Sequence, residues 1–430
     1  MILKRLSKNR VVQNAGWLIA GKVINMILSF FVGLLTARYL GPNNYGLINY
    51  ANAYTTFFFS LCTLGINSII VKEFTDHPNN VGQIIGSTLI LRAISSVLSF
   101  GIIIGIASFA DANETLTLIV VALCSLGLIF QIFDTFNYWF QYKLLSKYCA
   151  IATTIAYVIV SAYRIALLAM HKDVTWFAIT SSIDHIVIAI ILIVTYQKHG
   201  GSKLSFSIDR CKSLLKKSHH FILAGLMVSI YGATDKLMLK QMLDEANVGY
   251  YSTAVAVCNI WVFVLSAIID SLNPVIMEKH NSDYDGYVLY NKRLYAIVFY
   301  LSVAVSIGFM LFSTPIIKTL YGEAYLPAAM PLKIITWYTA FSYLGVARNA
   351  WIVCEEKQHF LKYLYIGAAI TNVLLNLILI PKFGSSGAAM ASLITQISTI
   401  LIFPAMIKDL RPNVKMMFDA IIFKNNKSYM

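Results

Sequence analysis

The sequence predicts an all-α, polytopic membrane protein. Of its 430 residues, 58% are hydrophobic and only 13% are charged, whereas soluble domains carry about 25% charged residues. The apolar residues fall in long runs that match the ~20 residues a helix needs to cross a bilayer. The basic residues gather in alternate segments between these runs. These three observations together indicate a bundle of membrane-spanning helices.

Twelve apolar runs are long enough to cross a hydrocarbon core about 30 Å thick as helices. The first run follows several basic residues, as a signal peptide does, but it exceeds the apolar core of about 7–15 residues typical of signal peptides. We therefore expect an uncleaved first span. The predicted spans lie at residues 11–37, 46–71, 82–109, 115–139, 147–170, 174–196, 219–240, 248–275, 290–313, 327–352, 359–381 and 384–407.

The distribution of Lys and Arg predicts the orientation of these spans. With both termini in the cytoplasm, the inner segments and the span ends beside them hold 23 Lys and Arg residues, and the outer loops hold 5. Positively charged loops remain on the cytoplasmic side of a membrane. We therefore interpret the net charge of +14 as a signal that orients the spans in an inner (plasma) membrane, and not as a nucleic-acid-binding surface. We expect no nucleic-acid partner.

The longest internal loop divides the predicted spans into two groups of six. We expect an N-terminal lobe at residues 1–197, a basic cytoplasmic linker at 198–218 and a C-terminal lobe at 219–430. Because both lobes begin on the same side, they form a parallel repeat about an axis normal to the membrane. The linker's charge has two interpretations, a topology signal alone or attraction to anionic lipid headgroups.

The sequence contains no signal for catalysis or metal binding. No internal loop exceeds 22 residues, which leaves no space for a soluble catalytic domain. The phosphate-binding pattern G-x-x-x-x-G-K-[ST] and the zinc pattern H-E-x-x-H do not occur. The six Cys form no C-x-x-C pair, and we expect free thiols. We predict a transporter without cofactor or metal rather than an enzyme.

Ionisable residues inside the spans are the candidate functional residues, because such groups are costly in a membrane and usually face the bundle interior. Six cations outnumber four acids, and the surplus predicts an anionic ligand such as a pyrophosphate, which accepts several charge-assisted hydrogen bonds. The cations are Lys22, Arg92, Arg164, Lys236, Lys333 and Arg348, and the acids are Asp134, Asp184, Asp235 and Asp270.

The position of each cation along its span ranks the candidates. Lys22 lies near mid-depth, where a long side chain cannot reach the interface, and it is the strongest candidate. Lys333 lies near an outer end and is expected to reach the headgroups. Arg348 has an alternative role as an ion-pair partner of Glu355 or Glu356. The predicted cationic cavity residues are Lys22, Arg92, Arg164, Lys236 and Arg348.

The acids suggest ion coupling. Asp235 is a candidate carrier of a proton or a sodium ion, as intramembrane acids are in transporters; a salt bridge between helices, for example with Arg164, is the alternative. Asp134 and Asp270 are further candidates. Asp134 lies in an aromatic segment at residues 133–142, which is typical of an interfacial belt, with a sugar-binding platform as the alternative.

A turn after the first span recurs in the second half of the chain. In both copies a Leu is followed six positions later by a Gly, as Leu40 with Gly46 and Leu243 with Gly249. With its neighbours, this turn resembles the signature of the O-antigen and repeat-unit flippases, in the multidrug/oligosaccharidyl-lipid/polysaccharide exporter superfamily. Further resembling segments are residues 37–42, 64–73, 134–148, 218–274, 320–322 and 372–389.

The resemblance implies two six-helix lobes around a central cavity that opens alternately to each face. It implies transfer of an undecaprenyl-diphosphate-linked oligosaccharide to the outer leaflet of a bacterial inner membrane, for O-antigen, lipopolysaccharide or related glycan synthesis. Expected partners are the lipid bilayer, a proton or sodium ion, and a polysaccharide polymerase with its chain-length regulator. This chain has Lys22 where the family often has an acidic or amide residue.

Three alternatives belong to other functional classes. A drug/cation antiporter of the same superfamily should carry more acids and fewer cations in its cavity. A membrane polysaccharide polymerase typically has a large outer loop with Arg or His, whereas the outer loops here are short. A lipid II flippase commonly has helices beyond twelve. The cation surplus favours the oligosaccharide flippase.

Overall fold

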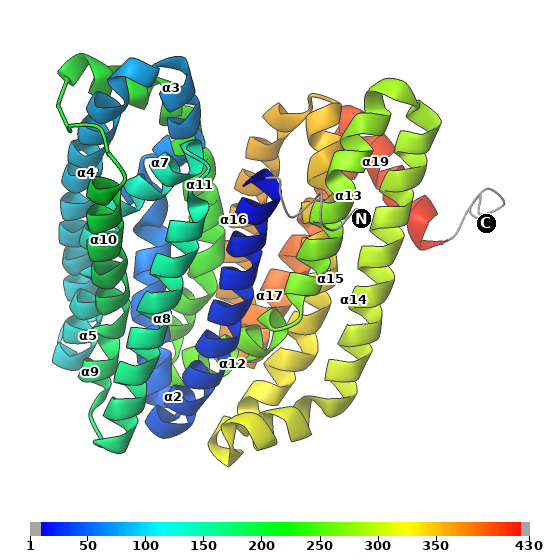
Figure 1. The fold of residues 1–430 in the computed structure, drawn as a ribbon. Helices are drawn as coiled ribbons and strands as arrows, with labels where there is room; N and C mark the ends of the chain where they lie inside the picture. The colour runs from blue at the N-terminus through cyan, green and yellow to red at the C-terminus, as the bar shows by residue number, and fades with distance from the viewer. Residues whose placement is uncertain (1–9, 423–430) are drawn as a thin grey trace. The chain divides into compact units, whose positions relative to one another are not determined.

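The fold is known from a computed structural model, in which the described residues 10–422 contain helices and no strands (Figure 1). Side chains are described for residues 25–422 except 223, 224 and 231. The chain forms two compact units, Met1–Ala233 and Thr234–Met430, which we call the N-terminal unit and the C-terminal unit. The division lies inside one long helix, α11 (Ile208–Met242), whereas the sequence predicts a division at residues 198–218. The predicted lobe bounds remain a prediction.

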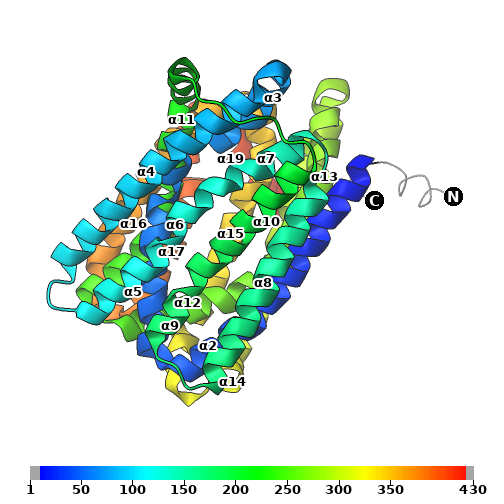
Figure 2. The ribbon, with the colours of Figure 1, turned by 60° about the vertical axis from the view of Figure 1, so that its left-hand side comes forward.

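The N-terminal unit is a bundle in which α8 packs between α2 and α10 (Figure 2). The 54-residue α2 is two helices joined at Gly41, whose backbone is non-helical with φ 72° and ψ 173°, so the chain breaks at the predicted Leu-Gly-Pro turn. The elements before α11 are α2 (Arg10–Thr63), α3 (Ile70–Asp76), α4 (Val81–Ala110), α5 (Thr115–Ser125), α6 (Gly127–Phe130), α7 (Thr135–Tyr142), α8 (Ser146–Ala169), α9 (Val174–Ala178) and α10 (Thr180–Lys198).

The C-terminal unit contains the end of α11 and eight further α-helices of the described chain. Asp244 caps the first of these, α12, by accepting a 2.8 Å hydrogen bond from the backbone N–H of Asn247, which satisfies a donor that the helix itself leaves unpaired. The helices are α12 (Glu245–Asn259), α13 (Val262–Ser282), α14 (Tyr284–Tyr321), α15 (Ala329–Cys354), α16 (Leu361–Phe383), α17 (Ser385–Ile397), α18 (Phe403–Met406) and α19 (Arg411–Ile421).

The protein is a multi-pass membrane protein. Among the described residues, seven helical stretches are long and apolar enough to cross a membrane, and the pair α12–α13, bent by 45°, makes an eighth. α15 falls outside this set and carries Lys333 and Arg348, and the kinked α2 and the polar-ended α11 are also outside it. The twelve predicted runs all lie on helices for most of their length. The count of twelve spans itself remains an expectation.

Two predicted elements differ from the structure. The second predicted span continues to residue 71, but α2 ends at Thr63, because Leu64 and Gly65 adopt positive φ values of 53° and 60°. The other difference is α19, which lies after the last predicted span, in the segment that the sequence predicts to be the cytoplasmic C-terminus. α19 packs on α14, where Asn413 donates a 2.8 Å hydrogen bond to the Tyr295 hydroxyl and Lys292 pairs with Asp419 at 3.1 Å.

The aromatic segment 133–142 lies largely in the core of the N-terminal unit. Phe136, Trp139 and Phe140 are buried, and the rings of Phe136 and Trp139 both pack against Tyr196 of α10, with centroids 4.6 and 4.8 Å apart. The expectation of an interfacial belt is therefore wrong for these three side chains. A long aromatic side chain has the same hydropathy in a core as in a belt, so the sequence pattern alone does not separate the two environments.

The α16–α17 hairpin depends on close backbone contact at Gly387. A Cβ atom added there would lie 2.1 Å from the carbonyl oxygen of Leu379, far inside van der Waals contact. We predict that Gly387→Ala lowers the free energy of unfolding by about 1–3 kcal/mol, the usual cost of overpacking. Thermal unfolding of the purified protein in detergent measures this change.

Gly308 in α14 supplies the matched control, since a Cβ there meets no atom within 4 Å. Gly308→Ala should leave stability unchanged or raise it by about 0.5–1 kcal/mol, because Ala loses less conformational entropy in a helix. Equal unfolding temperatures for the two variants would contradict the proposed backbone contact.

Candidate functional site

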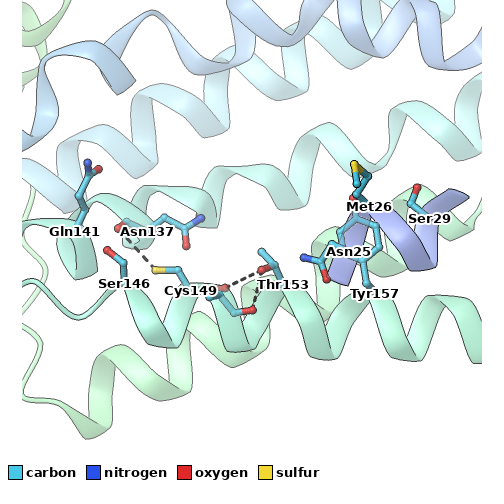
Figure 3. A pocket seen from close by; sticks show the side chains of 10 residues that line it. Asn25, Met26, Ser29, Asn137, Gln141, Ser146, Cys149, Thr153 and Tyr157 are labelled. Atoms are coloured by element: carbon cyan, nitrogen blue, oxygen red, sulfur yellow. Dashed lines mark hydrogen bonds between the residues drawn. The ribbon is translucent and has the colours of Figure 1, made fainter. Parts of the chain in front are cut away.

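The N-terminal unit contains three neighbouring cavities, and the largest, of about 580 Å³, lies between α2, α7 and α8 (Figure 3). Asn25 and Tyr157 stand at one end, and Gln141 and Ser146 stand at the other. The ten lining residues are Asn25, Met26, Ser29, Asn137, Gln141, Ser146, Cys149, Ala150, Thr153 and Tyr157. None of these ten carries a charged side chain. The described lining is thus electrically neutral and combines amide and hydroxyl groups with apolar side chains.

The hydrogen-bonding capacity of this cavity is only partly used within the protein. Thr153 donates to the backbone carbonyl of Cys149 at 3.0 Å, but the amide oxygens of Asn25 and Asn137 are buried without a hydrogen-bond partner among the described residues. Buried polar atoms are normally satisfied. Amides and hydroxyls both donate and accept, so the lining suits a ligand rich in hydroxyl groups.

A smaller cavity of about 210 Å³ adjoins the first and shares Ser29 and Tyr157 with it. This cavity is charged, because Arg164 of α8 and Asp184 and His185 of α10 all line it. The Arg164 guanidinium donates one hydrogen bond, from Nη2 to the Thr180 hydroxyl at 2.9 Å. Arg164 Nε, Asp184 Oδ1 and His185 Nδ1 are buried without partners among the described residues. Three polar atoms of the residues that line this cavity are thus left without a partner within the described protein.

The third cavity, of about 510 Å³, extends this system along α2 and shares Ser181 and His185 with the charged cavity. Its wall includes Asn52, Thr55 and Gln131. The N-terminal unit therefore holds two compartments whose described linings include amides and hydroxyls, and both border on the charged centre at Arg164, Asp184 and His185. A ligand with a polar neutral part and an anionic part matches the first compartment together with Arg164.

A buried carboxylate lies at the centre of a hydrogen-bond network in the C-terminal unit. The side chain of Asp235, 5% exposed, accepts from Asn372 Nδ2 at 3.0 Å and Asn376 Nδ2 at 2.7 Å on Oδ1. On Oδ2 it accepts from the Tyr251 hydroxyl at 2.5 Å and from the Ser392 hydroxyl. Four helices, α11, α12, α16 and α17, therefore meet at one carboxylate. We call these five residues the Asp235 cluster.

The Asp235 cluster is chemically suited to a proton or a monovalent cation. One carboxylate among four neutral groups supplies at most a single negative charge, and amide, hydroxyl and carboxylate oxygens are the donors that hard cations prefer. The amide oxygen of Asn376 is buried without a partner among the described residues, which leaves an oxygen donor beside the carboxylate. Within the described chain, no group of three His, Cys, Asp or Glu side chains is placed to hold a metal ion.

A family model described as "Polysaccharide biosynthesis protein" matches residues 11–280 of this chain. The protein belongs to the polysaccharide biosynthesis protein family.

Similar proteins agree with this membership. The uncharacterized membrane protein MJ1068 of Methanocaldococcus jannaschii is 20% identical over 417 residues, which cover 90% of this chain and 81% of that protein. The lipid II flippase MurJ in its inward closed conformation superposes with a TM-score of 0.73 at 16% identity, covering 94% of this chain and 90% of the other.

A multidrug resistance MATE family transporter of the MOP superfamily, in an inward-facing conformation, superposes with a TM-score of 0.66 at 14% identity, covering 93% and 96% of the two chains. At these identities the likeness concerns the fold. The fold is the one shared by these MurJ and MATE structures, and the match to the polysaccharide biosynthesis family confirms the family resemblance in the sequence.

The structure places the predicted cavity cations in different surroundings. Among those whose side chains are described, Arg164 alone lines one of the three cavities described above. Arg92 is buried in α4, where Nη1 donates to the Thr135 hydroxyl at 2.9 Å and Asp134 lies within electrostatic range. Arg348 is buried, and its Nη1 donates to the carbonyl of Thr399 at 3.4 Å. The side chain of Lys22 lies outside the described residues.

The remaining candidates also lie in different surroundings. Lys236 is half-buried beside Asp235, with which it interacts electrostatically. Asp134 interacts with Arg92 and His185. Asp270 is exposed on α13 and makes no hydrogen bond to the Asp235 cluster. The alternative ion pair of Arg348 with Glu355 is not formed, since Glu355 instead lies 3.8 Å from His280.

Several site residues were missed because they carry no formal charge or are not unusual alone. Asn372 and Asn376 were noted only as part of the resemblance, yet two amides four residues apart in an apolar run lie on one helix face. That spacing was the available signal for the Asp235 cluster. His185 lines two cavities, and its position next to Asp184 in an apolar run was the corresponding signal in the N-terminal unit.

The Asp235 cluster predicts a strong and local effect on stability. Asp235→Ala removes the acceptor for four buried donors, and each unsatisfied buried group costs about 1–3 kcal/mol. We expect a loss of about 3 kcal/mol or more in the free energy of unfolding. Thermal unfolding in detergent measures it, with Asp270→Ala as the exposed control that should change stability by less than about 0.5 kcal/mol. Similar losses in both variants would show that the network does not hold the unit together.

Proposed function

We propose that this protein is a flippase that moves undecaprenyl-diphosphate-linked oligosaccharide repeat units from the cytoplasmic to the outer leaflet of a bacterial inner membrane. The product would be O-antigen or a related surface polysaccharide. In this proposal both termini are cytoplasmic, the two predicted lobes alternate between access states, and a polymerase with its chain-length regulator takes up the product.

One observation carries the proposal: a cavity whose described lining is neutral and includes amides and hydroxyls adjoins a charged cavity containing Arg164. Sugar hydroxyls match the first lining, and a diphosphate matches the guanidinium, because charge-assisted hydrogen bonds to Arg are strong and directional. Membership of the polysaccharide biosynthesis family supports the same substrate class.

The physics of the cargo supports alternating access. An oligosaccharide is too polar to cross hydrocarbon, since each unsatisfied hydroxyl costs several kcal/mol there, on the order of 4–8 kcal/mol in the most apolar reference solvent. The lipid tail needs no protection and remains in the bilayer. The protein therefore has to shield only the headgroup, for which the described cavities offer about 580 and 210 Å³.

The Asp235 cluster supports coupling to a proton or sodium gradient. A single carboxylate surrounded by amides and hydroxyls from four helices changes its charge on binding a proton or a cation. Such a change alters the packing of all four helices together. Within this proposal Asp235 is the coupling residue, Asp134 is a second candidate in the N-terminal unit, and the exposed Asp270 is the least favoured of the three.

The first experiment locates the lipid-linked glycan in cells that lack the protein. We expect single repeat units to be trapped where an impermeant lectin or glycosidase added to spheroplasts cannot reach them, and the plasmid-borne gene should restore access. Exposed but unpolymerised units would point to a polymerase defect. An unchanged glycan pool would favour the drug/cation antiporter, and either result would reject the proposal.

The charged cavity gives a second prediction. Arg164→Ala should weaken headgroup binding about ten- to hundredfold, because a hydrogen bond to a charged group contributes about 1.5–3 kcal/mol, and Lys22→Ala should also reduce export. Glycan export at normal protein levels in the membrane is the measurement. The control is Lys143→Ala, an exposed position outside the three cavities. Full export by both Arg164→Ala and Lys22→Ala would remove these residues from the binding site.

Asp235 gives a third prediction. Asp235→Asn keeps the size and hydrogen-bonding capacity of the side chain but removes its ability to change charge. Transport in vesicles with an imposed proton or sodium gradient should then lose its dependence on that gradient, while the variant is still present in the membrane. A gradient response equal to that of the wild type would make Asp235 a structural residue only.

A further inference from the structure

A non-helical segment at residues 203–207, which together with Ile208, the first residue of α11, we call the strap, lies along the first turns of α4 in the N-terminal unit. It connects α10 to α11 as a thin green trace (Figure 1). The backbone N–H of Ser205 donates to the carbonyl of Gly82 at 3.3 Å, and the N–H of Ser207 donates to the Ser87 hydroxyl at 3.2 Å. The linker between the predicted lobes is thus held on α4 rather than free.

Two glycines make this contact possible. Gly82 and Gly86 stand one turn apart on α4 and so share one face of the helix. A Cβ atom at Gly82 would lie 2.0 Å from the carbonyl oxygen of Lys203, and one at Gly86 would lie 2.2 Å from that of Ser205. Two small residues one turn apart often allow two helices to approach closely. Here they allow a non-helical segment to approach α4. Any side chain larger than hydrogen at these positions displaces the strap.

The strap leaves a row of apolar side chains uncovered. Its contacts with α4 run through residues 203, 205 and 207, and the residues between them are Leu204, Phe206 and Ile208. These three side chains are 49%, 52% and 56% exposed. The apolar residues thus alternate in sequence with the residues that contact α4, and α4 leaves about half of each apolar side chain uncovered.

Basic residues surround this apolar row. Lys198, Lys203, Lys212 and Lys216 are exposed on the strap and its flanking helices, and the acid nearest in sequence is Asp209. The other two cations of the linker have a structural role. Arg210 lies 3.7 Å from the buried carboxylate of Glu73, and Lys217 donates a hydrogen bond to it. This double contact fixes the start of α11, and the remaining lysines face solvent.

The length of α4 places the strap at the membrane interface. Its 30 residues extend about 45 Å at 1.5 Å per residue, whereas a hydrocarbon core is about 30 Å thick. An untilted α4 therefore exceeds the core by about ten residues, which fall at its ends. Gly82 and Gly86 lie within the first six residues of the helix. The strap beside them is thus at an end of the span, where the headgroups begin.

We propose that the strap is a binding site for anionic phospholipid, in which Leu204, Phe206 and Ile208 enter the headgroup–acyl boundary and the four lysines contact lipid phosphates. Apolar and basic side chains on one interfacial element are the combination that binds anionic bilayers. A topology signal alone requires the lysines but not the exposed apolar row or its glycine-dependent attachment. The site does not depend on the transported substrate.

The test places a fluorescent reporter on the strap of the full-length protein. Phe206→Cys is labelled with an environment-sensitive fluorophore in a Cys354→Ser background, since the other five cysteines are buried. The protein is reconstituted in phosphatidylcholine vesicles with increasing phosphatidylglycerol. Quenching by spin-labelled lipid reports membrane contact, and quenching by iodide reports exposure to water. Ile94→Cys, exposed near mid-length of α4, is the control that lipid should quench in every vesicle.

We expect lipid quenching at position 206 to rise with phosphatidylglycerol and to fall with salt. Lys203→Gln and Lys212→Gln should each lower the affinity of the strap for phosphatidylglycerol, measured in this titration, about fivefold. This factor is the contribution of one Lys near an anionic surface. Lys382→Gln, an exposed lysine of the C-terminal unit, should leave it unchanged. Gly86→Leu should make the reporter accessible to iodide, whereas Gly101→Leu, where a Cβ meets no atom within 4 Å, should not.

Three outcomes would overturn the proposal. Equal lipid quenching in neutral and anionic vesicles would mean a general apolar contact. Iodide quenching at high phosphatidylglycerol would mean that the strap stays in water. Protection from both quenchers would mean that protein, rather than lipid, covers the apolar row.

Discussion

A buried carboxylate must find donors inside an apolar bundle, and the C-terminal unit is built around this constraint. Asp235 is 5% exposed and receives hydrogen bonds from Tyr251, Asn372, Asn376 and Ser392. These donors come from three helices besides its own, so one side chain fixes the mutual positions of four. Unpaired, the carboxylate would cost several kcal/mol, on the order of the penalty for an isolated buried ion. Because these hydrogen bonds join four helices, a change in the charge of Asp235 affects the packing of the whole unit.

The N-terminal unit handles its buried charges differently. Arg92 and Arg164 are each held through a threonine hydroxyl, at 2.9 Å in both cases, instead of through an ion pair. A neutral partner leaves most of a guanidinium's five donors unused. For Arg164 this incomplete satisfaction coincides with a cavity and with unpartnered atoms of Asp184 and His185. One unit thus contains a network centred on a carboxylate with four donors, and the other contains a guanidinium with few partners beside a cavity. These arrangements suit an ion site and a ligand site respectively.

Much of the candidate site follows from charge within apolar runs. Arg164 and Asp235 stand out in the sequence because an ionisable group in a membrane span needs a partner, and both occupy notable positions in the structure. The same rule also selects Arg92, Arg348 and Asp270. It cannot distinguish these three residues from Arg164 and Asp235, because the depth of a residue along a span does not determine the direction in which its helix face points. The neutral partners Asn372, Asn376 and Tyr251 carry no such signal, and neither does the cavity lined by Asn25 and Asn137.

The sequence by itself determined the class of the protein: its apolar runs, alternating basic segments and family resemblance specify a multi-pass helical membrane protein of the polysaccharide biosynthesis family. These properties are local or additive along the chain, so they survive without knowledge of packing. Tertiary structure decided which polar groups meet. The break of α2 at Leu64, the burial of Trp139 and the docking of residues 203–208 on Gly82 and Gly86 all depend on contacts between residues distant in sequence. Hydropathy cannot rank such contacts, because core, interface and lipid-facing positions of a membrane protein are all apolar.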